Sequence, residues 1–536
     1  MDGSGGGSVQ GLELVVVLGA TILLGGAIAS RLSVAAPLVL LVLGAGLGFI
    51  PALGSIELPP DLVLLLFLPA LLYWDALNTS LREIRANLRV ILLLSVGLVF
   101  ATAGVVALVA HAFGLAWPMA IALGAILAPT DATAVVAVAG RLPRRTITIL
   151  RAESLVNDGT ALVLYSVAVA AAVSGVPASL GETSLRFVAS YGFGIAIGLV
   201  VGLAVVAVRL YVRERLLANT LSVLTPFLAY LPAEALGVSG VVAVVTCGLV
   251  LSQLGPRVIT ASMRSQSFGF WQLATYILNG ALFVLIGIEL HKIVLGLDGS
   301  WGSTVALGVI IALSVLAVRL AWTNTTPYLI RAIDRRPQQR SRRVPFRQRF
   351  PLGWAGFRGA VSLAAALALP QQTADGQPLE GRNVVIAVTF TVILFTLLVQ
   401  GLTMPAVVRW ARLPPDPTEL DEELLAEQET LRAMLDALPD TASRLGVPVE
   451  ASQRLAKNYE ALLERIHREE GNPEQARRDE IDTDHEAALR LALLPIKRKT
   501  LLRLRDENHI DDVILRRVQA RIDLEELRLS DDTGAE

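Results

Sequence analysis

The sequence predicts an all-α membrane protein of about thirteen transmembrane helices followed by a helical cytoplasmic tail. Hydrophobic residues make up 54% of the 536 residues, and the mean hydropathy is +0.59. Apolar runs of about 18 or more residues, which are typical of membrane-spanning helices, recur from Gly11 to about Trp410. From Pro415 onward the chain has 18 Lys and Arg against 30 Asp and Glu, whereas the preceding part has 28 against 17. The net charge is thus −12 from Pro415 onward and +11 before it, which indicates that the two parts lie in different environments, the part before Pro415 in a membrane and the part after it in water.

We therefore expect a transmembrane domain over residues 1–412 and an acidic helical domain in the cytoplasm over residues 413–536. Amphipathic patterns at 419–438, 455–470 and 497–529 predict helices in the second part. No Lys or Arg precedes the first apolar run, which argues against a cleaved signal peptide. The predicted spans lie near residues 11–30, 34–50, 58–78, 87–112, 116–140, 147–174, 184–210, 218–234, 237–254, 268–290, 302–330, 352–370 and 383–411.

The charges of the loops predict how these spans are oriented. Cytoplasmic loops collect Lys and Arg, and here the loops after odd-numbered spans do so, whereas the others hold mostly acids. This alternation places the N-terminus outside and the tail in the cytoplasm of a multi-pass plasma-membrane protein. The arginines of the loops after odd-numbered spans are Arg31, Arg82, Arg85, Arg141, Arg144, Arg145, Arg213, Arg215, Arg257, Arg264, Arg331, Arg335, Arg336, Arg340, Arg342, Arg343, Arg347 and Arg349.

An odd number of spans allows two halves of inverted topology, with the seventh span as connector. The spans at 116–140 and 352–370 then correspond to each other, and both are interrupted. Pro129 removes a helical hydrogen bond from the first, while Gly353, Gly356 and Gly359 surround Arg358 in the second. Paired interruptions of this kind indicate a transporter binding site near the middle of the membrane.

Acidic residues in the apolar stretch 124–164 predict what that site binds. A carboxylate at this depth costs about 2.5–3.5 kcal/mol or more, so such residues usually face a partner or a water-filled path. Ser154 and Asp158 are four residues apart and share a helix face. Together with Thr130 and Asp131 they form an oxygen-rich set that suits a hard cation such as sodium. The stretch has no His or Cys, which disfavours zinc or copper.

Glu153 lies on a different face from Asp158, and we expect it to form an ion pair with Arg358. Asp75, at the end of the third span, is equally compatible with the route by which an ion enters and with an interfacial carboxylate in water. Arg319 is expected to pair locally or to extend to the interface. The single cysteine, Cys247, excludes an intrachain disulfide, and no GxxxxGK[ST] phosphate loop is present.

Four motifs carry a family resemblance. APTDATAVVAV, AESLVNDGTALVL, GFRGAVSLAAALALP and TFTVILFTLLVQGLTMP, in this order, resemble the sodium/proton exchanger branch of the monovalent cation:proton antiporters, over about residues 10–412. The resemblance implies a thirteen-helix inverted-repeat homodimer. It also implies exchange of sodium or lithium for protons as a core, about 87–174 and 302–411, moves against a dimerisation domain. We accordingly expect a role in pH homeostasis, no cofactor and no nucleic-acid partner, with the ions and membrane lipid as the other partners.

The resemblance also assigns roles to residues. Asp158 matches the aspartate that carries sodium and proton alternately, and Asn157 before it resembles the electroneutral branch. Ala132 stands where such exchangers often have proline, and Asp75 where many have glutamate. By the same resemblance, cation or proton binding is implied for Asp158, Asp131, Thr130, Ser154 and Asn157, and a structural ion pair for Glu153 and Arg358.

Two other functions are compatible with parts of the sequence. A potassium/proton antiporter or a cation channel of the same fold would use the same charged residues. An intramembrane aspartyl protease built on Asp131 and Asp158 is a remote alternative, because its GxGD motif is missing. That protease would also leave Glu153, Ser154 and Arg358 without a role.

Overall fold

The computed structural model describes residues 6–32, 34–50, 63–79, 81–139, 142–175, 180–212, 214–295, 301–333, 345–413 and 417–471, with isolated positions beyond 493. Within these ranges the chain is helical, and its extended pairing is a single bridge between Gln372 and Pro378. The chain divides into two compact units, Met1–Pro415 and Asp416–Glu536. Each unit is described by itself.

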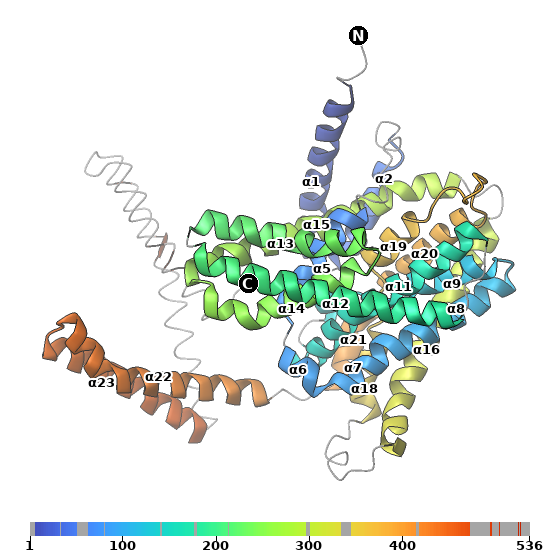
Figure 1. Cartoon of the computed structure of the whole chain (residues 1–536). Coiled ribbons are helices and arrows are strands. Elements are labelled where there is room, and N and C mark those ends of the chain that lie inside the picture. Colours follow the sequence, from blue (N-terminus) through green and yellow to red (C-terminus); the bar gives the residue numbers. More distant parts are fainter. Residues whose placement is uncertain are drawn as a thin grey trace. The chain divides into compact units, whose positions relative to one another are not determined.

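The first unit is a bundle of α-helices, several of them extended by a π-helical turn, at Val63–Phe67, Leu93–Gly97 and Thr396–Gln400 (Figure 1). Its helices are α1 (Gly6–Leu32), α2 (Ala36–Leu47), α5 (Leu68–Leu77), α6 (Leu81–Ala86), α7 (Leu88–Leu92), α8 (Leu98–Ala112), α9 (Trp117–Leu127), α10 (Ala132–Ala139), α11 (Arg144–Ser174), α12 (Leu180–Tyr211), α13 (Arg215–Ala235), α14 (Gly240–Val258), α15 (Ala261–Leu295), α16 (Trp301–Ile333), α18 (Phe346–Trp354), α19 (Ala360–Leu367), α20 (Arg382–Phe395) and α21 (Gly401–Ala411).

These helices confirm the predicted all-α membrane fold. Ten helices of the described residues are long and apolar enough to cross a membrane, and shorter apolar helices lie at Ala36–Leu47 and Leu65–Leu77. Large apolar side chains such as Leu185, Val200 and Leu210 of α12 are exposed, as expected for a surface that faces lipid. The number thirteen stays a prediction.

Both predicted interruptions are present. Residues 128–131 separate α9 from α10, and residues 355–359 separate α18 from α19. The two breaks meet, because the backbone N–H of Asp131 donates to the carbonyl of Phe357 at 2.9 Å. Gly359 allows this approach, since a Cβ at that position would overlap the side chain of Asp131. The broken helices therefore cross in the interior of the unit.

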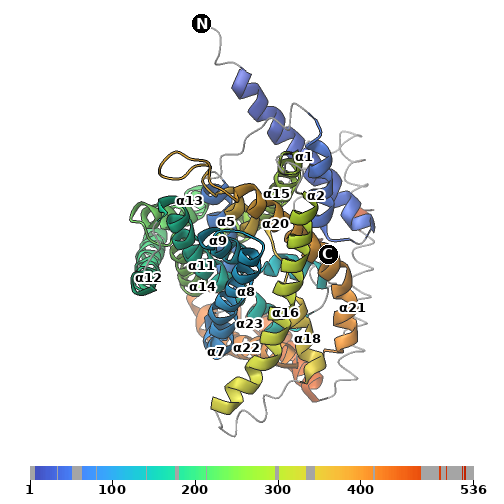
Figure 2. The same ribbon diagram turned by 90° about the vertical axis from the view of Figure 1, so that its right-hand side faces the viewer.

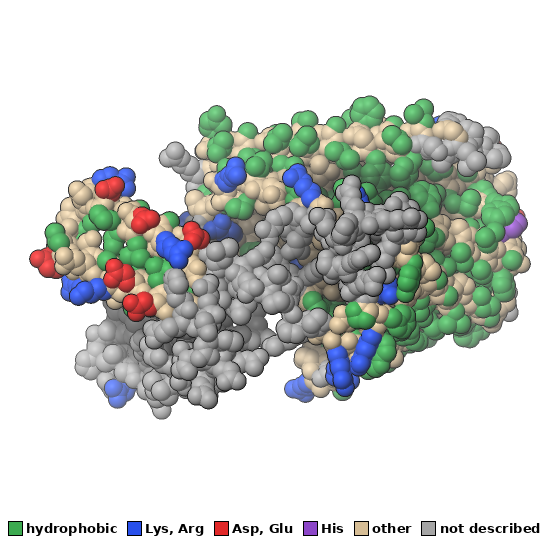
Figure 3. All heavy atoms as spheres, turned by 90° about the horizontal axis from the view of Figure 1, so that it is seen from below, with side chains coloured by type: hydrophobic (Ala, Val, Ile, Leu, Met, Phe, Trp, Pro, Cys, Tyr) green, Lys and Arg blue, Asp and Glu red, His purple; other side chains and the backbone are tan. Residues whose placement is uncertain are grey.

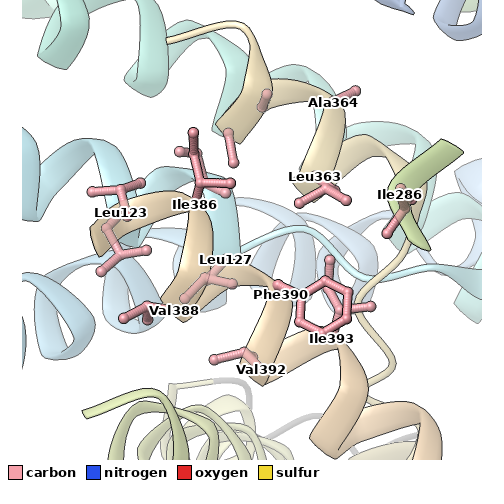
Figure 4. Packing of buried hydrophobic residues seen from close by; sticks show 14 of the residues in the cluster. Leu123, Leu127, Ile286, Leu363, Ala364, Ile386, Val388, Phe390, Val392 and Ile393 are labelled. Carbon is pink, nitrogen blue, oxygen red and sulfur yellow. The ribbon is translucent and has the colours of Figure 1, made fainter. Parts of the chain in front are cut away.

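A large apolar core surrounds the crossing. Figure 4 shows Leu123 and Leu127 of α9 packed with Ile386 and Val388 of α20. Leu363 and Ala364 of α19 and Ile286 of α15 belong to the same cluster. The span that contains the first break, Trp117–Val136, is more buried than the other candidate spans. In Figure 2, α12 lies on one side of α9 and α11, and α16, α18 and α21 lie on the other.

The second unit contains two helices in its described part, α22 (Pro417–Leu445) and α23 (Val449–Gly471). Gly446 ends α22 with φ of 63°, the left-handed conformation that favours glycine after a helix. The two helices pack against each other, so the amphipathic patterns at 419–438 and 455–470 do form helices. The pattern predicted at 497–529 lies outside the residues that the structure describes, apart from isolated positions.

One helix pair shows how closely the backbones pack. Gly44 of α2 lies against the backbone of Val284 in α15, and Gly287 of α15 lies against Leu41 and Ala45 of α2. Small residues allow such close contact between helices in a membrane, where packing drives association. A larger residue at either position would push the helices apart.

We therefore expect Gly44→Ala to lower thermal stability, because the added methyl overlaps the backbone of Val284. Overpacking of this kind costs about 1–3 kcal/mol. The matched control is Gly46→Ala in the same helix, where a Cβ would meet open space. Thermal unfolding of the two purified variants checks the prediction, and equal melting temperatures would contradict it.

Candidate functional site

A cavity of about 110 Å³ lies where the two breaks meet. Its walls come from α5, α10, α11, α15, α19 and both breaks, so it joins segments far apart in the sequence. Four of the residues predicted to bind an ion line it, and Asp75 lines it as well. The polar residues of its lining are Asp75, Thr130, Asp131, Thr133, Ser154, Asp158, Thr275, Asn279 and Ser362.

Asp158 is the most buried of the three carboxylates that line the cavity. It is 4% exposed, and its side chain has no hydrogen-bond partner among the described residues. The charges of Asp75 and Asp131 act on it. Like charges repel strongly where water is scarce, and a bound proton or cation relieves that repulsion. The cavity therefore favours one of the two as an occupant.

Thr130 is held by α11 through three hydrogen bonds. The Ser154 hydroxyl donates to its carbonyl at 2.8 Å, and Asn157 Nδ2 donates to its hydroxyl at 2.9 Å. The Thr130 hydroxyl in turn donates to Glu153 Oε1 at 3.2 Å. These bonds satisfy polar groups that the break in the helix would otherwise leave unpaired. Asn157 does not belong to the described lining of the cavity, so it orients Thr130 in this structure.

Asp131 has two roles in the structure. Its Oδ1 accepts hydrogen bonds from the Thr133 hydroxyl and from the Ala134 backbone N–H, the latter at 3.1 Å. These are the bonds of a residue that caps the N-terminus of a helix, and they explain how α10 starts although Ala132 is not a proline. The other carboxylate oxygen, Oδ2, lies next to Gly359.

Glu153 forms its ion pair with Arg319 of α16, so the predicted partner, Arg358, was wrong. Arg319 Nη1 and Nη2 lie 2.5 and 3.2 Å from Glu153 Oε1 and Oε2, and both side chains are at most 1% exposed. Gly356 accommodates this pair, because a Cβ there would come within 2.9 Å of Arg319 Cδ. The glycine-rich break thus leaves room for Arg319 to reach Glu153.

Arg358 lies nearby without this bond. Its backbone N–H donates to the Thr396 hydroxyl at 3.3 Å. Its Nε and Nη1 are buried without a hydrogen-bond partner among the described residues. The charges of Arg319 and Glu153 both act on it. The sequence contains two arginines, Arg319 and Arg358, in apolar segments that could pair with Glu153. Only the packing of the helices decides which of them does.

Sequence reasoning missed the part of the cavity wall that α15 supplies. Thr275 and Asn279 of α15 line the cavity, as does Ser362 of α19. The Thr275 hydroxyl donates to the Trp271 carbonyl at 2.7 Å, and the Asn279 side chain has no partner among the described residues. The signal was a lone asparagine within the apolar run YILNGALF.

The described residues contain no group of three or more His, Cys, Asp or Glu side chains that could hold a metal ion by themselves. Asp75, Asp131 and Asp158 therefore do not converge as a carboxylate cage. A cation in this cavity would have a carboxylate together with hydroxyl and carbonyl oxygens, which suits a weakly held monovalent ion.

Comparisons with known proteins agree with this arrangement. Residues 19–410 match the family model described as "Sodium/hydrogen exchanger, transmembrane". An uncharacterized Na+/H+ exchanger of Mycobacterium bovis is 45% identical over 538 residues, covering 99% of this chain and 98% of the relative. A sodium, potassium, lithium and rubidium/H+ antiporter of Bacillus pumilus is 30% identical over 449 residues, covering 81% of this chain and 66% of the relative.

The fold also matches a solved structure. The sodium proton antiporter MjNhaP1 of Methanocaldococcus jannaschii, solved at pH 8, superposes with a TM-score of 0.59 at 19% identity. The match covers 75% of this chain and all of that one. Fold, family model and near-full-length relatives agree, and the chain therefore belongs to the sodium/hydrogen exchanger family of multi-pass membrane transporters, whose members exchange monovalent cations for protons.

Proposed function

We propose that this chain exchanges sodium or lithium for protons across the plasma membrane by alternating access, without net charge movement. The observation that carries the proposal is the buried, unpartnered carboxylate of Asp158 in a cavity at the crossing of two broken helices. Electroneutrality is supported by Asn157, which resembles the electroneutral branch of the family.

The mechanism rests on competition for Asp158. Burial disfavours its ionised form, whereas a bound cation favours that form, so proton and cation exclude each other. We assign the cation to Asp158, Asp131, Thr130 and Ser154, with Asn157 holding Thr130 in place. Asp75, on the cavity wall supplied by α5, belongs to the route by which the ion enters.

Exchange needs a moving element, and we propose that it is the core at about 87–174 and 302–411. Contacts within the unit support this grouping: α9 packs on α8, α11, α19 and α20, and α16 packs on α8, α18 and α20. We further propose a transmembrane domain over residues 1–412, a homodimer, an outside N-terminus, and a cytoplasmic acidic domain over residues 413–536. The transported ions are the substrates, no cofactor or nucleic acid takes part, and pH homeostasis is the expected role.

The alternatives differ in what they require of the site. A potassium/proton antiporter would use the same residues, and the relative from Bacillus pumilus is named for several alkali cations. An aspartyl protease would need Asp131 free to share a proton with Asp158. The capping bonds of Asp131 to Thr133 and Ala134 disfavour that role.

The ion can be identified in sealed vesicles that contain the purified protein and a pH gradient. We expect sodium and lithium to collapse the gradient, and potassium to do so weakly or not at all. An equal response to potassium would replace sodium selectivity with general alkali-cation exchange. No response to sodium or lithium would refute the proposal.

Asp158→Asn should abolish exchange in the same vesicles, because an amide cannot alternate between proton and cation. The protein should stay folded, since the Asp158 side chain makes no hydrogen bond to the described residues. Asp375→Asn, at an exposed position in a loop, is the matched control and should exchange normally. Sodium-dependent proton flux in the Asp158 variant would remove Asp158 from the centre of the mechanism.

The ion pair of Glu153 with Arg319 is proposed to be structural. Arg319→Met strands a buried charge, which costs about 3–5 kcal/mol, so we expect a large fall in melting temperature. Adding Glu153→Gln should recover part of it. Arg358→Met is the comparison, and should lower the melting temperature less because Arg358 lacks that pair. A larger loss from Arg358→Met would show that Arg358 is the stabilising partner.

A further inference from the structure

Arginines and aromatic side chains gather where α16 ends, α18 begins and α21 ends. Arg349 of α18 lies over the ring of Tyr328 in α16, with Cζ 5.4 Å from the ring centre. Arg347 lies over Trp410 of α21 at 5.3 Å, and its Nε donates to the Trp410 carbonyl. We call this group the arginine corner; its residues are Tyr328, Arg347, Arg349, Arg409, Trp410 and Arg412.

The arginine corner carries positive charge that acidic residues of its own three helices do not balance. Neither α16, α18 nor α21 contains an Asp or Glu. Two of the arginines lie in the first turn of α18, where the helix dipole is positive and favours an anion. In Figure 3 both acidic and basic side chains are visible on the tail helices, whereas the Lys, Arg, Asp and Glu side chains visible on the membrane unit are basic. An anion from outside the membrane unit would therefore be stabilised here.

Some guanidinium N–H donors of the arginine corner have no acceptor among the described residues. Arg349 Nε and Nη1 are buried without a hydrogen-bond partner among the described residues. Arg409 and Arg412 are exposed. Arginine presents donors in a planar fork that matches the oxygens of a phosphate group. The chemistry of the arginine corner thus fits a phosphate better than a monoatomic anion.

The aromatic side chains indicate a membrane as the source of that phosphate. Tyr328 and Trp410 are 59% and 47% exposed, and Phe346 beside them is 53% exposed. Tyr and Trp at the ends of membrane spans sit at the level of lipid headgroups. The loop charges place this end of the helices on the cytoplasmic side, where anionic lipid attracts arginine by about 1 kcal/mol per residue.

We propose that the arginine corner binds the headgroup of an anionic phospholipid of the cytoplasmic leaflet, with the acyl chains along α16 and α21. The lipid neutralises charge that no acid of these three helices balances. This inference does not depend on which cation the protein exchanges.

The test is lipid binding to the purified full-length protein in detergent, measured by native mass spectrometry with phosphatidylglycerol or phosphatidylcholine. We expect preference for phosphatidylglycerol, and an affinity about fivefold lower for each arginine removed in Arg347→Gln/Arg409→Gln. The matched control is Arg257→Gln/Arg264→Gln, which removes two exposed arginines predicted on the same side of the membrane. Arg409→Gln alone guards against misfolding, because Arg409 is exposed and its side chain makes no hydrogen bond or ion pair with the described residues.

Each other outcome overturns the proposal. An equal loss in both double variants would show a general charge effect rather than a site. Displacement by excess inorganic phosphate would show an anion site that does not need lipid. A wild-type protein that binds both lipids equally would show that another group of the chain neutralises the arginines.

Discussion

The structure depends on satisfying backbone groups where two helices are broken inside an apolar interior. An unpaired N–H or C=O in such surroundings costs several kcal/mol, and each break exposes several. The two breaks of this chain solve part of the problem for each other through the bond from Asp131 to Phe357. Ser154 and Thr396 supply further partners for backbone groups, and Asn157 bonds to the side-chain hydroxyl of Thr130. The polar residues that a cation can use are thus the same ones that make the breaks tolerable.

The acidic side chains around this crossing fall into two groups, one in a closed ion pair and those that line the cavity. Glu153 and Arg319 neutralise each other in a closed pair, which leaves Asp158 as the buried carboxylate that faces the cavity without a hydrogen bond. Asp131 combines both kinds of environment. Its Oδ1 caps α10, and its Oδ2 lies next to Gly359, which lines the cavity. In the proposed mechanism, the ion therefore needs no dedicated cage of carboxylates.

Patterns along the chain predicted the fold and five of the nine polar residues that line the cavity. The apolar runs and the interruptions at Pro129 and Gly353–Gly359 follow from local chemistry, and the helices bear them out. The orientation that the loop arginines predict stays a prediction. The partner of Glu153 could not be found this way, because Arg319 and Arg358 are both single arginines in apolar surroundings. Distance selects between them, and distance depends on packing. Asn279 was missed for a related reason. It comes from α15, whose sequence has no break and no charged residue between Arg264 and Glu289.

Gly356 shows what the ion pair demands of its surroundings. Its backbone does not have the positive φ that would by itself require glycine, so its lack of a side chain matters as free volume through which Arg319 reaches Glu153. The residues at positions 153, 319 and 356 therefore constrain one another. A side chain at position 356 would be tolerated only after Arg319 and Glu153 had already been replaced. If position 356 changed first, the new side chain would displace Arg319 and break its ion pair with Glu153.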